Sequence, residues 1–151
     1  MAWIDLHTGL GPSGVGERIW AGGHDAAAIG RARRWWGDQV TSIYDGSSTS
    51  ALLTGLMWGA IHDAAPQAEY TGIALEYGTE PIMEVLDALR GDQWLAQHPE
   101  APPELAASIK ARLLKAFYTD TDAWKGQVVS QARQAMFQAV DGLRADSASA
   151  A

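Results

Sequence analysis

The stretch Thr71-Gly-Ile-Ala-Leu-Glu76 decides the fold predicted for this chain of 151 residues. Its apolar residues run almost without interruption as far as Glu76, and Gly78 follows shortly after. A strand that is buried on both faces has this pattern, and such strands belong to largely parallel sheets. The sequence therefore predicts an α/β fold, in which a mixed, mostly parallel sheet has helices packed on both faces.

Further strands and helices are predicted on both sides of this segment. Asp25 is expected to cap the first helix, and Pro81 to occupy the first turn of the third. The segment 9–16 contains four glycines and a proline, which predicts a loop. The other predicted strands span residues 3–6 and 40–44, and the predicted helices span 25–36, 52–64 and three segments after residue 80.

The apolar residues of the last three helices recur at helical spacing, which predicts a buried stripe on each helix. The stripe is Ile82, Leu86 and Leu89 on the first of these helices. It is Leu105, Ile109, Leu113 and Phe117 on the second, and Trp124, Val128, Met136, Val140 and Leu143 on the third.

Length and element count predict one domain over residues 1–145, followed by a disordered tail over 146–151. Three predicted strands offer little apolar surface to five helices, so the chain is expected to be part of a larger sheet domain. An incomplete sheet exposes a strand edge and apolar helix faces. We therefore expect a homo-oligomer, or a partner chain that supplies upstream segments.

Composition narrows the classes of function and partner. The net charge is −7, which disfavours binding to a nucleic-acid backbone. No apolar run approaches the roughly 20 residues of a membrane span, and the N-terminal residues lack the pattern of a signal peptide. Cysteine is absent, which excludes disulfides and thiolate chemistry and favours a cytoplasmic location.

Three polar residues stand at the ends of the two clearest predicted strands. Asp5 and His7 are two positions apart, so their side chains share one face of their strand. Glu76 ends the other strand, and open α/β sheets place ligands at the carboxyl ends of their strands. A histidine and a carboxylate meeting there predict a metal with its general base or a metal-free acid–base pair. The alternatives are a strand-end histidine bonded to backbone and a solvated glutamate.

Two predicted loops contain residues that suit a binding site. The glycines of segment 9–14 match the spacing of a dinucleotide-binding loop, but neither a following helix nor the acidic residue about twenty positions on is present. Nucleotide binding is therefore not predicted. The polar segment Asp45–Ser50 is predicted to form a further wall of the cleft, because its hydroxyl groups suit polar ligand contacts.

Several segments resemble, in order, a bacterial domain family of unknown function that is related to the zinc carboxypeptidases and the aspartoacylase group. Trp3-Ile-Asp-Leu-His-Thr-Gly-Leu-Gly-Pro-Ser-Gly-Val-Gly-Glu17 is similar to the strand and loop that carry the third zinc ligand. The similarity continues over residues 36–42, 45–47, 73–79, 85–90, 94–95, 110–118 and 122–125.

The resemblance implies a zinc-dependent hydrolase of the carboxypeptidase type, acting on a peptide or an N-acyl amino acid. In such an enzyme His7 would be a zinc ligand, and Glu76 would be the general base that takes a proton from the attacking water. Supporting or cleft positions would be Asp5, Thr8, Glu17 and Ser47.

The sequence departs from this family at the remaining zinc ligands. The family takes them from a His-x-x-Glu motif upstream of the third ligand, and no histidine of this chain has glutamate three positions later. The chain is therefore expected to correspond to the carboxyl-terminal part of such an enzyme, with weak zinc binding and no activity alone. The alternative function is an inactive binding or assembly module.

Overall fold

The computed structural model describes residues 1–23 and 25–149. Over these residues the chain forms one four-stranded mixed sheet and five helices, which confirms the predicted α/β class. The strands are β1 (Ala2–Ser13), β2 (Gly16–Trp20), β3 (Thr41–Ser42) and β4 (Thr71–Gly78). The helices are α1 (Ala26–Trp36), α2 (Trp58–Ala64), α3 (Ile82–Gln97), α4 (Pro103–Phe117) and α5 (Asp122–Ser149).

The strands lie in the order β1-β4-β2-β3. β4 is parallel to β1 and antiparallel to β2, and the short β3 is parallel to β2. β4 thus lies between β1 and β2, which are consecutive in the sequence. Its register with β1 places Ala74 opposite Asp5 and Glu76 opposite His7. The carboxyl ends of β1 and β4 therefore meet, as the sequence predicted.

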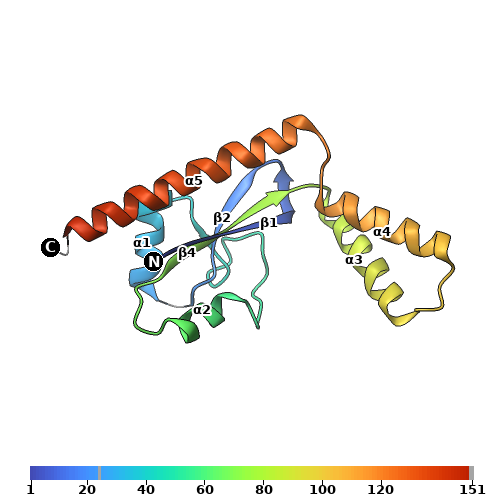
Figure 1. Cartoon of the computed structure of the whole chain (residues 1–151), viewed down its shortest axis with the longest axis horizontal. Helices are drawn as coiled ribbons and strands as arrows, with labels where there is room; N and C mark the ends of the chain where they lie inside the picture. Colours follow the sequence, from blue (N-terminus) through green and yellow to red (C-terminus); the bar gives the residue numbers. More distant parts are fainter. Residues whose placement is uncertain (24, 150–151) are drawn as a thin grey trace.

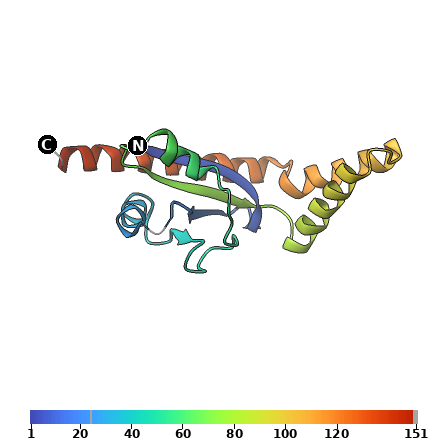
Figure 2. The same cartoon turned by 90° about the horizontal axis from the view of Figure 1, so that it is seen from below.

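Helices cover both faces of the sheet, and one pair of helices leaves it. Figure 1 views the sheet nearly edge-on, with α1 and α5 on one side and α2 on the other. Figure 2, turned by 90°, shows β1 and β4 running alongside each other. In both views α3 and α4 form a hairpin that projects beyond the end of the strands.

The face of β4 beneath α1 and α5 is closed. Ile73, Leu75 and Tyr77 are fully buried there, because alternate residues of a strand point to the same face. Side-chain hydrogen bonds join this layer to α5: the Tyr77 hydroxyl donates to a backbone carbonyl of α5 at 3.0 Å, and Trp36 Nε1 to another at 2.9 Å. Trp124 Nε1, on α5, donates to the last carbonyl of β4 at 3.0 Å.

The beginning of α1 confirms one local prediction, and the end of β1 corrects another. The Asp25 carboxylate accepts hydrogen bonds from the backbone N–H groups of Ala27 and Ala28, in the first turn of α1, and so caps the helix. The predicted loop over 9–16 is wrong, since β1 continues to Ser13 and β2 starts at Gly16. A Cβ at Gly78 would lie 2.1 Å from the carbonyl oxygen of Gly11, so glycine lets the two backbones meet.

The predicted stripe of α3 is also wrong. Ile82, Leu86 and Leu89 are exposed, whereas Val85 and Ala88 are buried. Because the α3–α4 hairpin projects from the sheet, each helix covers little more than its partner, and the wide apolar stripe has no layer to pack on. The predicted inward residues Leu105 of α4 and Met136 and Val140 of α5 are exposed as well, while Trp124 is buried and Val128 and Leu143 are half-buried.

Three predicted element bounds differ from the structure. The helix predicted over 52–64 begins only at Trp58, and the strand predicted over 40–44 is reduced to β3. The tail predicted to be disordered is helical as far as Ser149, and residues 150 and 151 lie outside the described residues. Despite the length of α5, none of the described helices combines the length and apolar character needed to cross a membrane.

Candidate functional site

The pairing of β1 with β4 brings together Asp5 and His7, from the middle of β1, and Glu76, near the carboxyl end of β4. We name these three residues the acid corner. His7 Nε2 lies 2.8 Å from Asp5 Oδ2, and His7 Nδ1 lies 3.8 Å from Glu76 Oε2. The side chain of His7 is 53% exposed, whereas that of Glu76 is 8% exposed. With its proton on Nε2, the imidazole donates to Asp5 and turns the lone pair of Nδ1 toward Glu76.

Burial sets the protonation behaviour of Glu76. It raises the pKa of this carboxyl above the ordinary value of 4.5. The backbone N–H of Leu10, which donates to Glu76 Oε1 at 3.1 Å, and nearby His7 oppose the rise, and the neighbouring Glu17 and Asp5 carboxyls add to it. A carboxylate with a raised pKa is a stronger base than one in water, which suits proton transfer near neutral pH.

Glu17 stands opposite Glu76 in the register of β2 and β4 but has the contrary environment. Its carboxylate accepts from the hydroxyl of Thr41 at 2.6 Å and from the backbone N–H of Thr49 at 3.1 Å, and the Thr49 hydroxyl also contacts it. Burial alone would raise the pKa of Glu17, but these hydrogen bonds outweigh burial and lower it. Glu17 therefore stays ionised and anchors the segment after β3.

A cavity of about 160 Å³ opens beside the acid corner. Ala74 lies between Asp5 and Glu76 on its sheet side, and apolar side chains enclose most of the remainder. We name these side chains the apolar wall: Ile19, Ile43, Leu53, Leu56, Met57 and Trp58. A few polar groups at one end of an apolar hollow are the usual composition of a small-molecule site.

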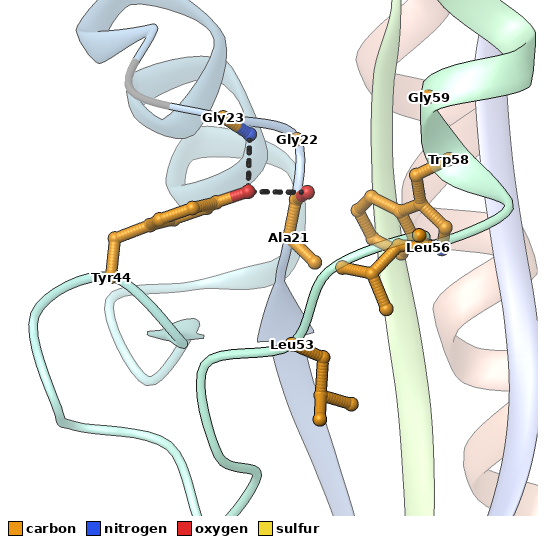
Figure 3. Close-up of a pocket in the computed structure, with 9 residues that line it drawn as sticks. Ala21, Gly22, Gly23, Tyr44, Leu53, Leu56, Trp58 and Gly59 are labelled. Carbon is orange, nitrogen blue, oxygen red and sulfur yellow. Dashed lines mark hydrogen bonds between the residues drawn. The ribbon is translucent and has the colours of Figure 1, made fainter.

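A second cavity, of about 400 Å³, adjoins the first. Leu53, Leu56 and Trp58 line both cavities. Figure 3 shows Tyr44 across from Leu56 and Trp58, with its hydroxyl donating to the carbonyl of Ala21 at 3.0 Å and accepting from a backbone N–H. The two cavities therefore form one trough that leads away from the acid corner.

Thr8 and Ser47, also singled out in the sequence, line neither cavity of this trough. The Thr8 hydroxyl donates to the carbonyl of Phe117 at 2.7 Å, on the opposite face of β1. Ser47 Oγ donates to Asp45 and accepts from the backbone N–H of Ser42, so it stabilises a turn. Of the predicted wall over residues 45–50, Ser50 lines the smaller cavity.

Among the remaining histidines, His98 packs away from the acid corner. The His98 ring stacks on Trp94 at 4.1 Å between ring centroids, and its Nδ1 lies 2.7 Å from the Trp94 carbonyl oxygen. His62 belongs to α2, and His24 lies outside the described residues.

Sequence reasoning missed the apolar wall. Its main segment, Leu53–Trp58, was predicted to be the first turns of a helix, and β2, which contributes Ile19, was not predicted at all. The available signal was the pair of glycines at 55 and 59 around Leu56-Met-Trp58, since glycine weakens a helix. Gly55 has φ +74°, which ends any helical continuation there.

The residues present do not make up a zinc site. A catalytic zinc takes three protein ligands. Among the described residues, no group of three or more His, Cys, Asp or Glu side chains is placed to hold a metal ion. In addition, His7 Nε2 is engaged with Asp5. Any zinc bound beside His7 would need ligands from outside the described residues.

Comparison with known proteins identifies a family and no characterised relative. A family model described as "Protein of unknown function (DUF2817)" matches residues 1–131, which include the sheet, α1 to α4 and the acid corner. No curated protein and no solved structure matches the chain. The chain therefore belongs to the DUF2817 family of proteins of unknown function.

Proposed function

We propose that the acid corner is the proton-transfer part of a hydrolytic site that cleaves an amide bond in a peptide or an N-acyl amino acid. The observation that carries the proposal is a buried carboxyl with a raised pKa, held beside a histidine at the mouth of an apolar cavity. Perturbed titrating groups in a hollow are typical of catalytic sites. The resemblance of segments 3–17 and 73–79 to zinc carboxypeptidases points to the same reaction.

Each residue of the corner has a distinct role in this proposal. Glu76 takes a proton from the attacking water and returns it to the leaving amine. Asp5 fixes the ring of His7 through their 2.8 Å contact, so His7 presents a constant edge to the reacting groups. The N–H of Leu10 holds Glu76 Oε1, which leaves Oε2 for the water.

The zinc ion implied by the resemblance is not used in this assignment, because the described residues do not supply its ligand set. We propose His7 as the one zinc ligand that this chain would contribute to a complete site. For the chain alone we expect no turnover of peptides or N-acyl amino acids, with or without added zinc. Robust zinc-dependent hydrolysis that disappears in Glu76→Gln would show that the ligand set is complete after all.

A binding module that has lost catalysis is the second candidate function, and the trough beside the acid corner, with its apolar wall, favours it. The two functions differ in what they require of Glu76. A general base needs the raised pKa, whereas a passive cavity wall does not. Measuring the carboxyl titration of Glu76 by 13C NMR separates them, with Glu17 in the same sample as a reference. We expect the pKa of Glu76 to lie above 4.5 and the pKa of Glu17 to lie below 4.5. A Glu76 pKa at or below 4.5 would contradict the hydrolytic role.

Zinc titration followed by the imidazole resonances tests the role of His7. We expect weak, non-stoichiometric binding in which the His7 ring responds and His98, stacked on Trp94, does not. The His7→Asn variant should lose the response. A tight single site would reveal ligands beyond the acid corner, and a zinc response that leaves the His7 ring unchanged would remove His7 from the proposal.

A further inference from the structure

The cavity at the acid corner has the size of one small apolar group. Its volume is about 160 Å³, and an apolar cavity of about 150 Å³ holds a benzene molecule. The apolar wall, Ala21 and Ala74 line most of it, and the polar lining residues are Asp5, His7, Ser50 and Glu76. Along the apolar wall, water gains few hydrogen bonds. A phenyl ring or a leucine-sized side chain therefore fits this space.

The charges around the cavity are one-sided. Asp5 and Glu76 line the cavity, and Glu17 is close enough to act on Glu76 electrostatically. Among the described residues that line either cavity of the trough, none is lysine or arginine, and His7 is the one basic side chain. A carboxylate that entered beside the acid corner would lose water and meet two or three like charges, which is unfavourable. An ammonium group would meet carboxylate acceptors.

The trough also sets a direction for a longer ligand. The larger cavity continues from Leu53, Leu56 and Trp58 toward the backbone at Gly22 and Gly23 (Figure 3). A ligand whose apolar group fills the smaller cavity can place its polar end at the acid corner or extend along the trough. Apart from His7, whose Nε2 already contacts Asp5, no described lining residue of either route is a basic side chain that could pair with a carboxylate.

We propose that this cavity binds a phenyl- or leucine-sized apolar group joined to a positively charged or neutral polar end, such as an amine or a primary amide, and excludes a free carboxylate. The proposal deepens the function proposed above and rests on it for the claim that the ligand is part of a substrate. The group beside the scissile amide would then carry an amine or a further amide bond. Binding itself requires no turnover.

Three compounds that share one phenethyl body test the proposal on the whole chain. They are 2-phenylethylamine, 3-phenylpropanamide and 3-phenylpropanoate, which are cationic, neutral and anionic at neutral pH. We expect affinity to fall in that order, with the amine at least tenfold tighter than the acid, measured by NMR chemical-shift titration. The largest shifts should fall on Ala74, Leu56 and Trp58.

Two variants locate the site, and one serves as a control. Ala74→Leu fills the cavity and should abolish binding of all three compounds, with circular dichroism confirming the fold. Glu76→Gln removes one charge while keeping the acceptor for the Leu10 N–H, so it should shrink the preference for the amine over the acid. Leu52→Ala should bind as the wild type does, because Leu52 is exposed and lines neither cavity.

The binding experiment can refute the binding site without refuting the hydrolytic role, and the Glu76 titration can refute the hydrolytic role without refuting the binding site. Tightest binding of the acid, equal binding of all three, no binding at millimolar concentration or shifts centred elsewhere would each overturn it. The expected affinity series with an ordinary Glu76 titration would keep the binding site and refute the general base. A raised pKa of Glu76 without the expected affinity series would refute the binding site and keep the general base.

Discussion

The two faces of β4 differ in how they are packed: helices cover one face closely, and a cavity lies against the other. Ile73, Leu75 and Tyr77 point to one face, where α1 and α5 bury them completely. Ala74 and Glu76 alternate with them and point to the other face, where a loop and α2 leave a cavity beside the acid corner. Large residues close the first face, and the small Ala74 leaves space on the second. The strand is thus rigidly anchored on one side, which positions reactive groups on the other.

The contrast extends to hydrogen bonding. On the closed face, Tyr77 and Trp36 each find a backbone carbonyl of α5 inside the protein. Burial of its hydroxyl raises the pKa of Tyr77 to about 12, so this donor keeps its proton at every physiological pH. On the open face, Glu76 has one backbone donor and a distant histidine. The Tyr77 and Trp36 donors of the closed face are satisfied, whereas Glu76 retains capacity for a ligand or a water molecule.

Truncation on the closed face should have the largest effect on stability. Ile73 is 0% exposed, so Ile73→Ala leaves a cavity under α1 and α5. We expect a loss of about 2–5 kcal/mol in the free energy of unfolding, measured by urea denaturation. Leu52→Ala, at a position that is 66% exposed, is the control and should change it by less than about 0.5 kcal/mol. Similar losses in both variants would refute the closed packing.

Removing the charge of Glu17 should have the next largest effect. Glu17→Gln weakens the contacts with Thr41 and Thr49, and hydrogen bonds to a charged group contribute about 1.5–3 kcal/mol. Because the pKa of Glu17 is lowered in the folded state, its contribution is complete above the unfolded value of 4.5 and is lost as pH falls through the folded value. Urea denaturation at pH 7 and pH 3 should therefore show a smaller difference between the two proteins at pH 3 than at pH 7.

Helix α3 also has a buried side and an exposed side. Substitutions at the adjacent residues Val85 and Leu86 compare the two sides. Val85 is 2% exposed and Leu86 is 39% exposed. Val85→Ala removes two buried methyl groups and should lower the free energy of unfolding by about 1.5 kcal/mol, at roughly 0.8 kcal/mol each. Leu86→Ala should lower it by less than about 0.5 kcal/mol. If Leu86→Ala proves the more costly, an unseen layer covers the exposed stripe, as in an oligomer.

The smallest effect, of opposite sign, is expected at Glu76. Burial raises its folded pKa, so the folded state binds more protons than the unfolded state once pH exceeds 4.5. Stability then falls as pH rises from 4.5 through the folded pKa. Glu76→Gln should therefore melt slightly higher than the wild type at pH 7 and equally at pH 4. A lower melting temperature at pH 7 would mean that the charge is stabilised by contacts beyond Leu10 and His7.

The sequence alone determined the elements whose local signals agree with their packing. The apolar run of β4, the cap at Asp25 and the shared strand face of Asp5 and His7 all follow from residue order. The predicted strand end at His7 is wrong, because β1 continues to Ser13. The convergence of His7 and Glu76 on one cavity could be predicted because side chains alternate along a strand and parallel strands end together.

The tertiary structure decided those features that depend on contacts between segments far apart in the sequence. β2 became a strand because β4, far along the chain, offers an edge to pair with Glu17 and Ile19. The stripe of Ile82 and Leu86 predicted burial, but burial needs a partner layer, and the projecting α3–α4 hairpin has none on that side. The apolar wall likewise exists only because a loop crosses the sheet. Periodicity encodes which side of an element is apolar, whereas the opposing surface is supplied by residues far away in the sequence.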